Sequence, residues 1–129
     1  MDETRPARGD RRKLVAIIDT SEGHRAAAAD LLDALGFATC TFASAVDLLA
    51  CPWLGEIRAI LSETRLPGLS GLALVSALRA RGLATPVIIM AAHPDSPIER
   101  RAVQLGAFGY LAKPVDPERL LALLAQALT

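Results

Sequence analysis

The sequence predicts a single α/β domain, in which a doubly wound, five-stranded parallel sheet carries five helices on its two faces. Five short apolar runs, typical of strands buried on both faces, alternate with five stretches whose apolar residues recur at helical spacing. Such alternation favours parallel strands joined by right-handed crossovers. A chain of 129 residues that is 52% apolar is long enough for one sizeable core.

The first two strands flank an amphipathic helix. Leu14–Ile18 is a continuous apolar run, and residues 37–42 form a more polar, β-rich run that suits a strand near the sheet edge. Between them, Thr20 or Ser21 can cap a helix that Gly36 ends. The apolar face of this helix consists of Ala28, Leu31, Leu32 and Leu35.

The middle of the chain predicts a short helix, a strand and a longer helix. Ser44 opens the short helix, which Pro52 interrupts. The third strand runs from about Arg58 into Glu63. A helix over about 70–81 follows, and Gly82 ends it.

The last third repeats the pattern twice. Residues 86–91 form an apolar fourth strand, and Ser96–Glu99 has the capping serine, first-turn proline and glutamate of a helix start. That helix ends at Gly106, and residues 108–111 form the fifth strand. Asp116 caps a final helix that contains Leu120, Leu121, Leu124 and Leu128.

Charge, cysteine content and hydropathy exclude several classes of protein. Fourteen basic residues balance fourteen acidic ones, so we expect no direct binding to nucleic acid or to a membrane surface. Cys40 and Cys51 have no partners at metal-ligand spacing and make no disulfide framework. The chain has no membrane-spanning run and no signal peptide, which favours the cytoplasm. We interpret residues 1–12 as a flexible basic lead, with a nucleic-acid arm as the alternative, and residues 13–129 as the domain.

Functional side chains cluster where predicted strands end. Asp19 follows the first strand, Glu63 ends the third, and Lys113 and Pro114 follow the fifth. Open parallel sheets place their chemistry at the carboxyl ends of the strands, so we expect these residues to converge.

These motifs resemble those of response-regulator receiver domains, the CheY-like superfamily. Two segments carry the resemblance, which covers about residues 12–129: Glu63-Thr-Arg-Leu-Pro-Gly-Leu-Ser-Gly71 and Tyr110-Leu-Ala-Lys-Pro114. The resemblance implies a flavodoxin-like sheet with strand order 2-1-3-4-5. It also implies phosphorelay signalling in a two-component system, in which a histidine kinase transfers a phosphoryl group to an aspartate with the help of Mg²⁺.

Three positions depart from the family pattern. Thr20 stands where the family has a second acid, Glu63 where it has the acceptor aspartate, and Ala91 where a serine or threonine binds the phosphoryl group. Glu63 places its carboxylate about 1.5 Å further out, one bond length, and a misplacement of about 1 Å can cost ~100-fold in phosphoryl transfer. These departures predict a divergent pseudo-receiver whose phosphoacceptor site is altered.

Other family positions are retained. The aromatic of the fifth strand is Tyr110, and the pocket lysine and its proline are Lys113 and Pro114. The family's Mg²⁺ ligands would map onto Asp19, Glu63 and the carbonyl of Arg65. Without the second acid we expect no Mg²⁺ or only weak binding.

We therefore expect a non-enzymatic module that works through protein–protein contacts, without phosphorylation. The alternative is a working receiver that accepts a phosphoryl group from a histidine kinase at an atypical site. A third hypothesis, an unrelated nucleotide- or flavin-binding domain, is disfavoured because no glycine-rich phosphate loop follows the first strand. Glu63 either mimics the phosphorylated state or only neutralises Lys113. Tyr110 is either a switch decoupled from phosphorylation or an ordinary strand aromatic.

Partners follow from the resemblance: a histidine kinase, a phosphotransfer protein or an output protein. A homodimer through the fourth helix, fifth strand and fifth helix is an alternative, with contributions from Ile98, Arg101, Tyr110 and Arg119. Three further residues have mainly structural interpretations. His24 is read as exposed, His93 as part of a loop, and Trp53 as cover for the second helix, with a partner anchor as the alternative for Trp53.

Overall fold

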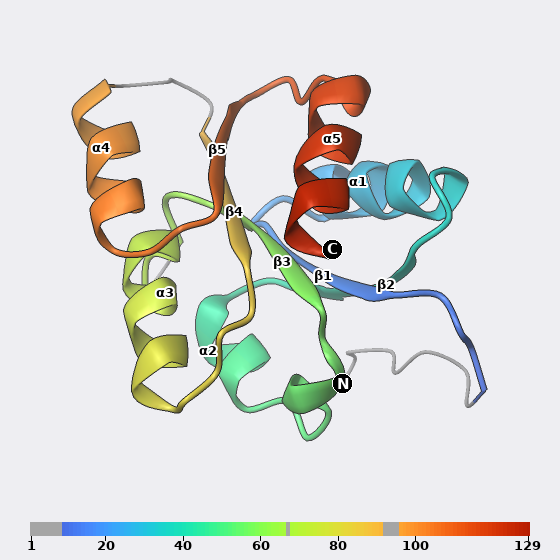
Figure 1. Cartoon of the computed structure of the whole chain (residues 1–129), viewed down its shortest axis with the longest axis horizontal. Helices are drawn as coiled ribbons and strands as arrows, with labels where there is room; N and C mark the ends of the chain where they lie inside the picture. The colour runs from blue at the N-terminus through green and yellow to red at the C-terminus, as the bar shows by residue number, and fades with distance from the viewer. Residues whose placement is uncertain (1–8, 67, 92–95) are drawn as a thin grey trace.

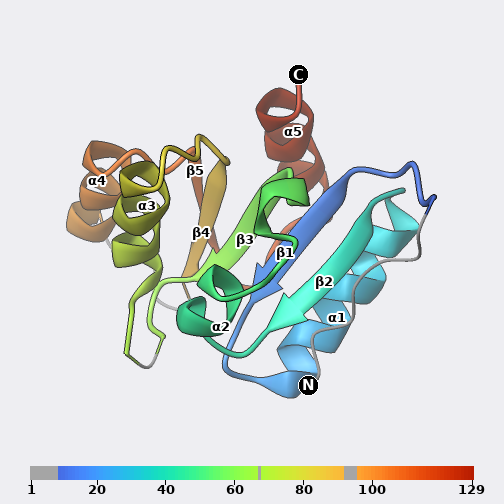
Figure 2. The same cartoon turned by 90° about the horizontal axis from the view of Figure 1, so that it is seen from below.

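The computed structural model describes residues 9–66, 68–91 and 96–129, and it shows a five-stranded parallel sheet between two layers of helices (Figures 1 and 2). The strand order is β2-β1-β3-β4-β5, as expected. The strands are β1 (Leu14–Ile18), β2 (Ala38–Phe42), β3 (Ala59–Glu63), β4 (Val87–Ala91) and β5 (Gly109–Ala112).

The helices divide between the two faces of the sheet (Figure 2). Helices α1 (Glu22–Ala34) and α5 (Pro117–Ala127) cover one face, and their buried leucines pack with β1, β3 and β4. Helices α2 (Ala45–Leu49), α3 (Gly71–Ala80) and α4 (Ser96–Gln104) cover the other face. The two layers enclose two apolar cores, one on each side of the sheet.

Local signals position the helices as the sequence predicts. The hydroxyl of Ser21, rather than that of Thr20, accepts a hydrogen bond from the His24 amide and caps α1. Ser44, Ser70 and Asp116 cap α2, α3 and α5 in the same way. Helix α1 ends beside Gly36, whose φ of 98° is a conformation that glycine adopts without strain.

Burial of the strands reflects their places in the sheet. All five residues of β1 and of β4 are buried, because helices cover both faces of these strands. In β2, buried residues alternate with partly exposed ones, as expected for a strand at the edge. The centre of the sheet is therefore fully buried, and parallel pairing places the carboxyl ends of β1, β3 and β4 together at one edge.

Several boundaries differ from the sequence expectation. β2 and β4 each begin one residue later, and β5 is shifted by one residue to end at Ala112. A 3-10 helix (Leu54–Glu56) lies before β3, where the sequence predicted no element. These shifts of one residue arise because apolar composition does not determine where the hydrogen bonds between strands begin.

Parts of the expected terminal lead and of the loop after β4 lie outside the described residues. These include residues 1–8 and His93. Within the lead, Arg12 donates hydrogen bonds to Asp10 and, at 2.6 Å, to Asp33 of α1. No helix in the described part of the chain is both long and apolar enough to cross a membrane.

Candidate functional site

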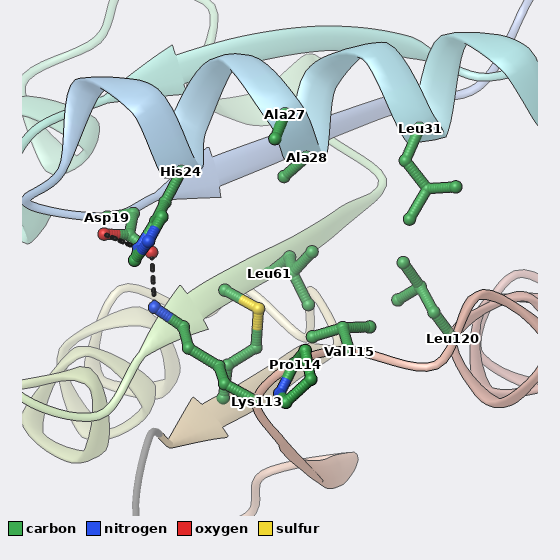
Figure 3. A pocket seen from close by; sticks show the side chains of 11 residues that line it. Asp19, His24, Ala27, Ala28, Leu31, Leu61, Lys113, Pro114, Val115 and Leu120 are labelled. Carbon is green, nitrogen blue, oxygen red and sulfur yellow. Dashed lines mark hydrogen bonds and ion pairs between the residues drawn. The ribbon is translucent and has the colours of Figure 1, made fainter.

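Asp19, Glu63 and Lys113 meet at the carboxyl edge of the sheet, as the sequence predicts (Figure 3 shows Asp19 and Lys113). The Lys113 Nζ atom lies 2.7 Å from Asp19 Oδ2 and 3.2 Å from Glu63 Oε1. Parallel pairing of β1 with β3, of β3 with β4 and of β4 with β5 brings these strand ends together. The lysine therefore bridges two carboxylates from two different strands.

Asp19 is the most deeply buried member, with 2% of its side chain exposed. Its Oδ1 atom accepts a hydrogen bond from the Ser21 amide at 2.9 Å, while its backbone carbonyl accepts one from Arg25 at 2.7 Å. A buried carboxylate requires such partners, because an unpaired buried charge is costly. Asp19 is thus held in place by the start of α1 as well as by Lys113.

The ammonium group of Lys113 is held in its charged form. Burial opposes the charge, but hydrogen bonds and charge attraction from Asp19 and then Glu63 outweigh burial and raise the pKa of Lys113 above its ordinary value. The side chain is 16% exposed, so water screens these contacts only in part. The positive charge is therefore a fixed part of the site across the neutral range.

Thr20 contacts Glu63 directly, a relationship that the sequence reasoning missed. The Thr20 hydroxyl lies 3.2 Å from Glu63 Oε2, and the Thr20 amide lies 3.5 Å from the same atom. Threonine at this position removes a negative charge, but it also adds a hydroxyl donor. The signal was present, because a hydroxyl donor at this position suits a longer carboxylate opposite it.

Ala91 and Tyr110 lie on the neighbouring strands. Ala91 is 6% exposed, and its carbonyl accepts the amide hydrogen bond of Lys113 at 2.8 Å. The ring of Tyr110 packs against the core beneath α2, α3 and α4. Its hydroxyl is buried, with no hydrogen-bond partner among the described residues. Tyr110 thus points inward rather than out into solvent.

The loop after β3 is fixed by close packing. The backbone of Gly71 lies so near the carbonyl oxygen of Glu63 that a Cβ atom at this position would collide with it. The buried hydroxyl of Thr64 donates a hydrogen bond to the Met90 carbonyl at 2.8 Å. These contacts fix where Glu63 leaves the sheet. Sequence reasoning did not single out Thr64.

The remaining predicted site residues are placed as follows. The Lys113–Pro114 peptide bond is cis, an isomer that the sequence left open. Arg65 is exposed in the loop after β3. His24 is 65% exposed, with Nδ1 at 3.9 Å from Asp19 Oδ1. Trp53 is half-buried against the core near α2, which agrees with its role as cover.

The donor set is poor for Mg²⁺. Mg²⁺ is held by carboxylate and other hard oxygen ligands. Here both carboxylates already face the ammonium of Lys113, and Thr20 directs a hydroxyl proton at Glu63. No cluster of three or more histidine, cysteine, aspartate or glutamate residues suited to a metal occurs in the described ranges.

The chain is similar to known proteins along most of its length. The chain is similar to the transcriptional regulatory protein FixJ of Bradyrhizobium diazoefficiens, with 34% identity over 115 residues that cover 88% of this chain and 56% of that protein. It is also similar to the DNA-binding transcriptional regulator NtrC of Salmonella typhimurium, with 35% identity over 118 residues that cover 92% of this chain and 25% of that protein. The chain therefore spans only about half or less of these relatives.

Solved structures show the same fold. The chemotaxis response regulator CheY4 of Vibrio cholerae matches with a TM-score of 0.80 and 26% identity, covering 91% of this chain and 99% of that one. Full-length FixJ from B. japonicum matches with a TM-score of 0.80 and 31% identity, covering 90% of this chain and 57% of that one. The family model for the response regulator receiver domain matches residues 15–125. The chain belongs to the response regulator receiver domain family.

Proposed function

We propose that this receiver domain signals through protein–protein contacts without accepting a phosphoryl group. The observation that carries the proposal is the double engagement of Glu63, whose Oε1 contacts Lys113 and whose Oε2 accepts from Thr20. Both oxygens of the acceptor-equivalent side chain are thus occupied inside the protein. An acceptor must instead approach a phosphorus atom in line, where position decides the rate.

The three departures act on separate parts of phosphoryl transfer. Thr20 brings no charge to hold a cation, Glu63 offers a displaced carboxylate, and Ala91 has no hydroxyl for a transferred group. Phosphoryl transfer relies almost wholly on positioning and on charge stabilisation. Without these three contributions, the polar groups of the site bind one another and leave none placed for phosphoryl transfer.

In this proposal Glu63 fixes the site in one arrangement. Its carboxylate links the ends of β1 and β5 through Thr20 and Lys113. Tyr110 packs inward against the core, which supports a ring position that does not depend on phosphorylation. The domain then presents one surface to its partners at all times.

The partners proposed are cytoplasmic signalling proteins: a histidine kinase, a phosphotransfer protein or an output protein. A second copy of this chain is the alternative, through α4, β5 and α5. Arg101 and Arg119 are exposed on this surface, and Phe108 is 42% exposed just before β5. The side chain of Ile98, also expected there, lies outside the described side chains.

Intact-mass spectrometry after incubation with acetyl phosphate and Mg²⁺ tests the proposal. The wild-type chain should gain no phosphoryl group. A variant that restores the family residues, Thr20→Asp with Glu63→Asp and Ala91→Thr, should gain one under the same conditions. A phosphoryl adduct on wild-type protein, at Glu63 or elsewhere, would overturn phosphorylation independence.

A further inference from the structure

A cavity of about 490 Å³ lies between α1 and the segment that joins β5 to α5, beside the candidate site (Figure 3). Leu61 of β3 and Met90 of β4 also line it. This volume falls within the range of small-molecule sites, which are mostly apolar with a few placed polar groups. The lining consists of Asp19, His24, Ala27, Ala28, Leu31, Leu61, Met90, Lys113, Pro114, Val115 and Leu120.

The cavity exists because α1 presents small side chains to it. Ala27 and Ala28 place only methyl groups opposite Pro114 and Val115, so the space between helix and loop is not filled. Ala27, Pro114 and His24 are exposed, so the cavity opens to solvent, and an occupant would remove its apolar lining from water. A cavity lined by two successive alanines is therefore suited to an occupant from outside the chain.

The two ends of the cavity differ in chemistry. Asp19, His24 and Lys113 lie together at one end in Figure 3, while Leu31 and Leu120 face each other at the other. An occupant must therefore have one polar end and one apolar end. The cavity runs from one end to the other along the axis of α1, so an elongated molecule fits it better than a compact one.

Charges at the polar end select against ions of either sign. Asp19 and Lys113 already pair at 2.7 Å, so a carboxylate would have to compete with Asp19 for Lys113, and an ammonium group would have to compete with Lys113 for Asp19. Hydrogen-bonding capacity nevertheless remains. An ammonium group has three donors, and within the described residues Lys113 directs two of them at Asp19 and Glu63. The exposed His24 ring adds a donor or an acceptor.

We propose that this cavity binds an uncharged, elongated amphipathic small molecule. Its hydrogen-bonding head, such as an alcohol or amide, contacts Lys113 and His24, and its apolar body lies between α1 and Val115 and reaches Leu31 and Leu120. The inference does not depend on phosphorylation independence. Because Lys113 also holds Glu63, an occupant contacts the same network that defines the candidate site.

Three octyl compounds with the same tail test the proposal: octan-1-ol, octanoate and octylammonium. Each is titrated into the ¹⁵N-labelled chain and followed by amide chemical shifts. Octan-1-ol should give saturable shifts centred on Ala27, Ala28, Leu31 and Val115. The two ions should bind at least about tenfold more weakly, since burying an unpaired charge is unfavourable. Equal binding of all three would overturn the selection for an uncharged head.

A matched pair of variants locates the binding. Ala28→Leu fills the cavity, whereas Ala26→Leu adds the same group at an exposed position of α1 outside the lining. Circular dichroism confirms that both fold. Octan-1-ol affinity should fall at least about fivefold in Ala28→Leu and stay unchanged in Ala26→Leu. Unchanged affinity in both variants, or shifts centred on other core residues, would overturn the site.

Discussion

The Thr20 hydroxyl donates a hydrogen bond to Glu63 Oε2 at 3.2 Å and so joins the ends of β1 and β3. The two residues therefore complement each other. A second acid at position 20 would place two carboxylates against one another, whereas threonine provides a donor. The longer glutamate side chain reaches that donor with one oxygen and Lys113 with the other.

Removing the Thr20 hydroxyl should weaken the fold slightly. We expect Thr20→Val to lower the free energy of unfolding by about 1 kcal/mol or less, because the hydrogen bond is charge-assisted but exposed to water. Thr20→Ser keeps the hydroxyl and should stay close to wild type. Urea denaturation of the three proteins measures this, and equal losses in both variants would show that the hydroxyl contributes nothing.

Removing the amine of Lys113 should have a larger effect. Lys113→Met leaves the buried Asp19 carboxylate without its cation, and we expect a loss of about 3 kcal/mol at neutral pH. Lys13→Met is the matched control, since Lys13 is an exposed lysine that donates to the Leu128 carbonyl at 3.0 Å. It should lose less than about 1 kcal/mol. Similar losses in the two variants would contradict a central role for Lys113.

Lys113 also predicts how stability depends on pH. The folded protein holds the pKa of Lys113 above its ordinary value of 10.5. The lysine therefore contributes its full stabilisation below that value, and the contribution is lost as pH rises through the folded pKa. Denaturation at alkaline pH should show the stability gap between wild type and Lys113→Met narrowing above pH 10.5. A gap that widens with pH would refute this assignment.

Close packing at Gly71 should tolerate no side chain. In Gly71→Ala the new Cβ would collide with the Glu63 carbonyl, and we expect a loss of about 1–3 kcal/mol. Gly55→Ala is the control, because a Cβ there meets open space. It should stay within about 0.5 kcal/mol of wild type. Thermal denaturation compares them, and a neutral Gly71→Ala would show that the loop after β3 shifts freely.

Cys40 should be unreactive in the folded protein. Burial raises the pKa of its thiol to about 12, although a hydrogen bond from Trp53 acts in the opposite direction. Near pH 8, the fraction of Cys40 present as the reactive thiolate is then about 1000-fold lower than that of a thiol with the ordinary pKa of 9.0. Iodoacetamide should label Cys40 of a Cys51→Ala variant at a useful rate only after unfolding. Rapid labelling of the folded variant would contradict this.

The fold was predictable because its signals are local. The apolar run of β1 and the capping serines at 21 and 44 each act within a few residues, and the structure has them where the sequence places them. The convergence of Asp19, Glu63 and Lys113 followed from the rule that parallel strands end together. These inferences needed only periodicity and topology.

The rest depends on contacts between distant residues. The Thr20–Glu63 hydrogen bond requires the spacing of two side chains across neighbouring strands, which residue types alone do not give. The cavity beside α1 requires the relative placement of Ala28 and Val115, which are far apart in the chain. Asp19, at 2.7 Å, lies nearer to the Lys113 amine than Glu63 does, at 3.2 Å, and residue types alone do not give this ranking.

Lys113 follows β5, which lies at the margin of the sheet and, within the described residues, pairs with β4 alone. A displacement of this outermost strand disturbs one ladder of backbone hydrogen bonds, whereas a displacement of β1 or β3 disturbs two. Lys113 is therefore attached to a strand that moves more easily than β1, the strand that precedes Asp19. A change in the attraction between Lys113 and Asp19 should therefore displace β5 at the sheet edge before it displaces β1.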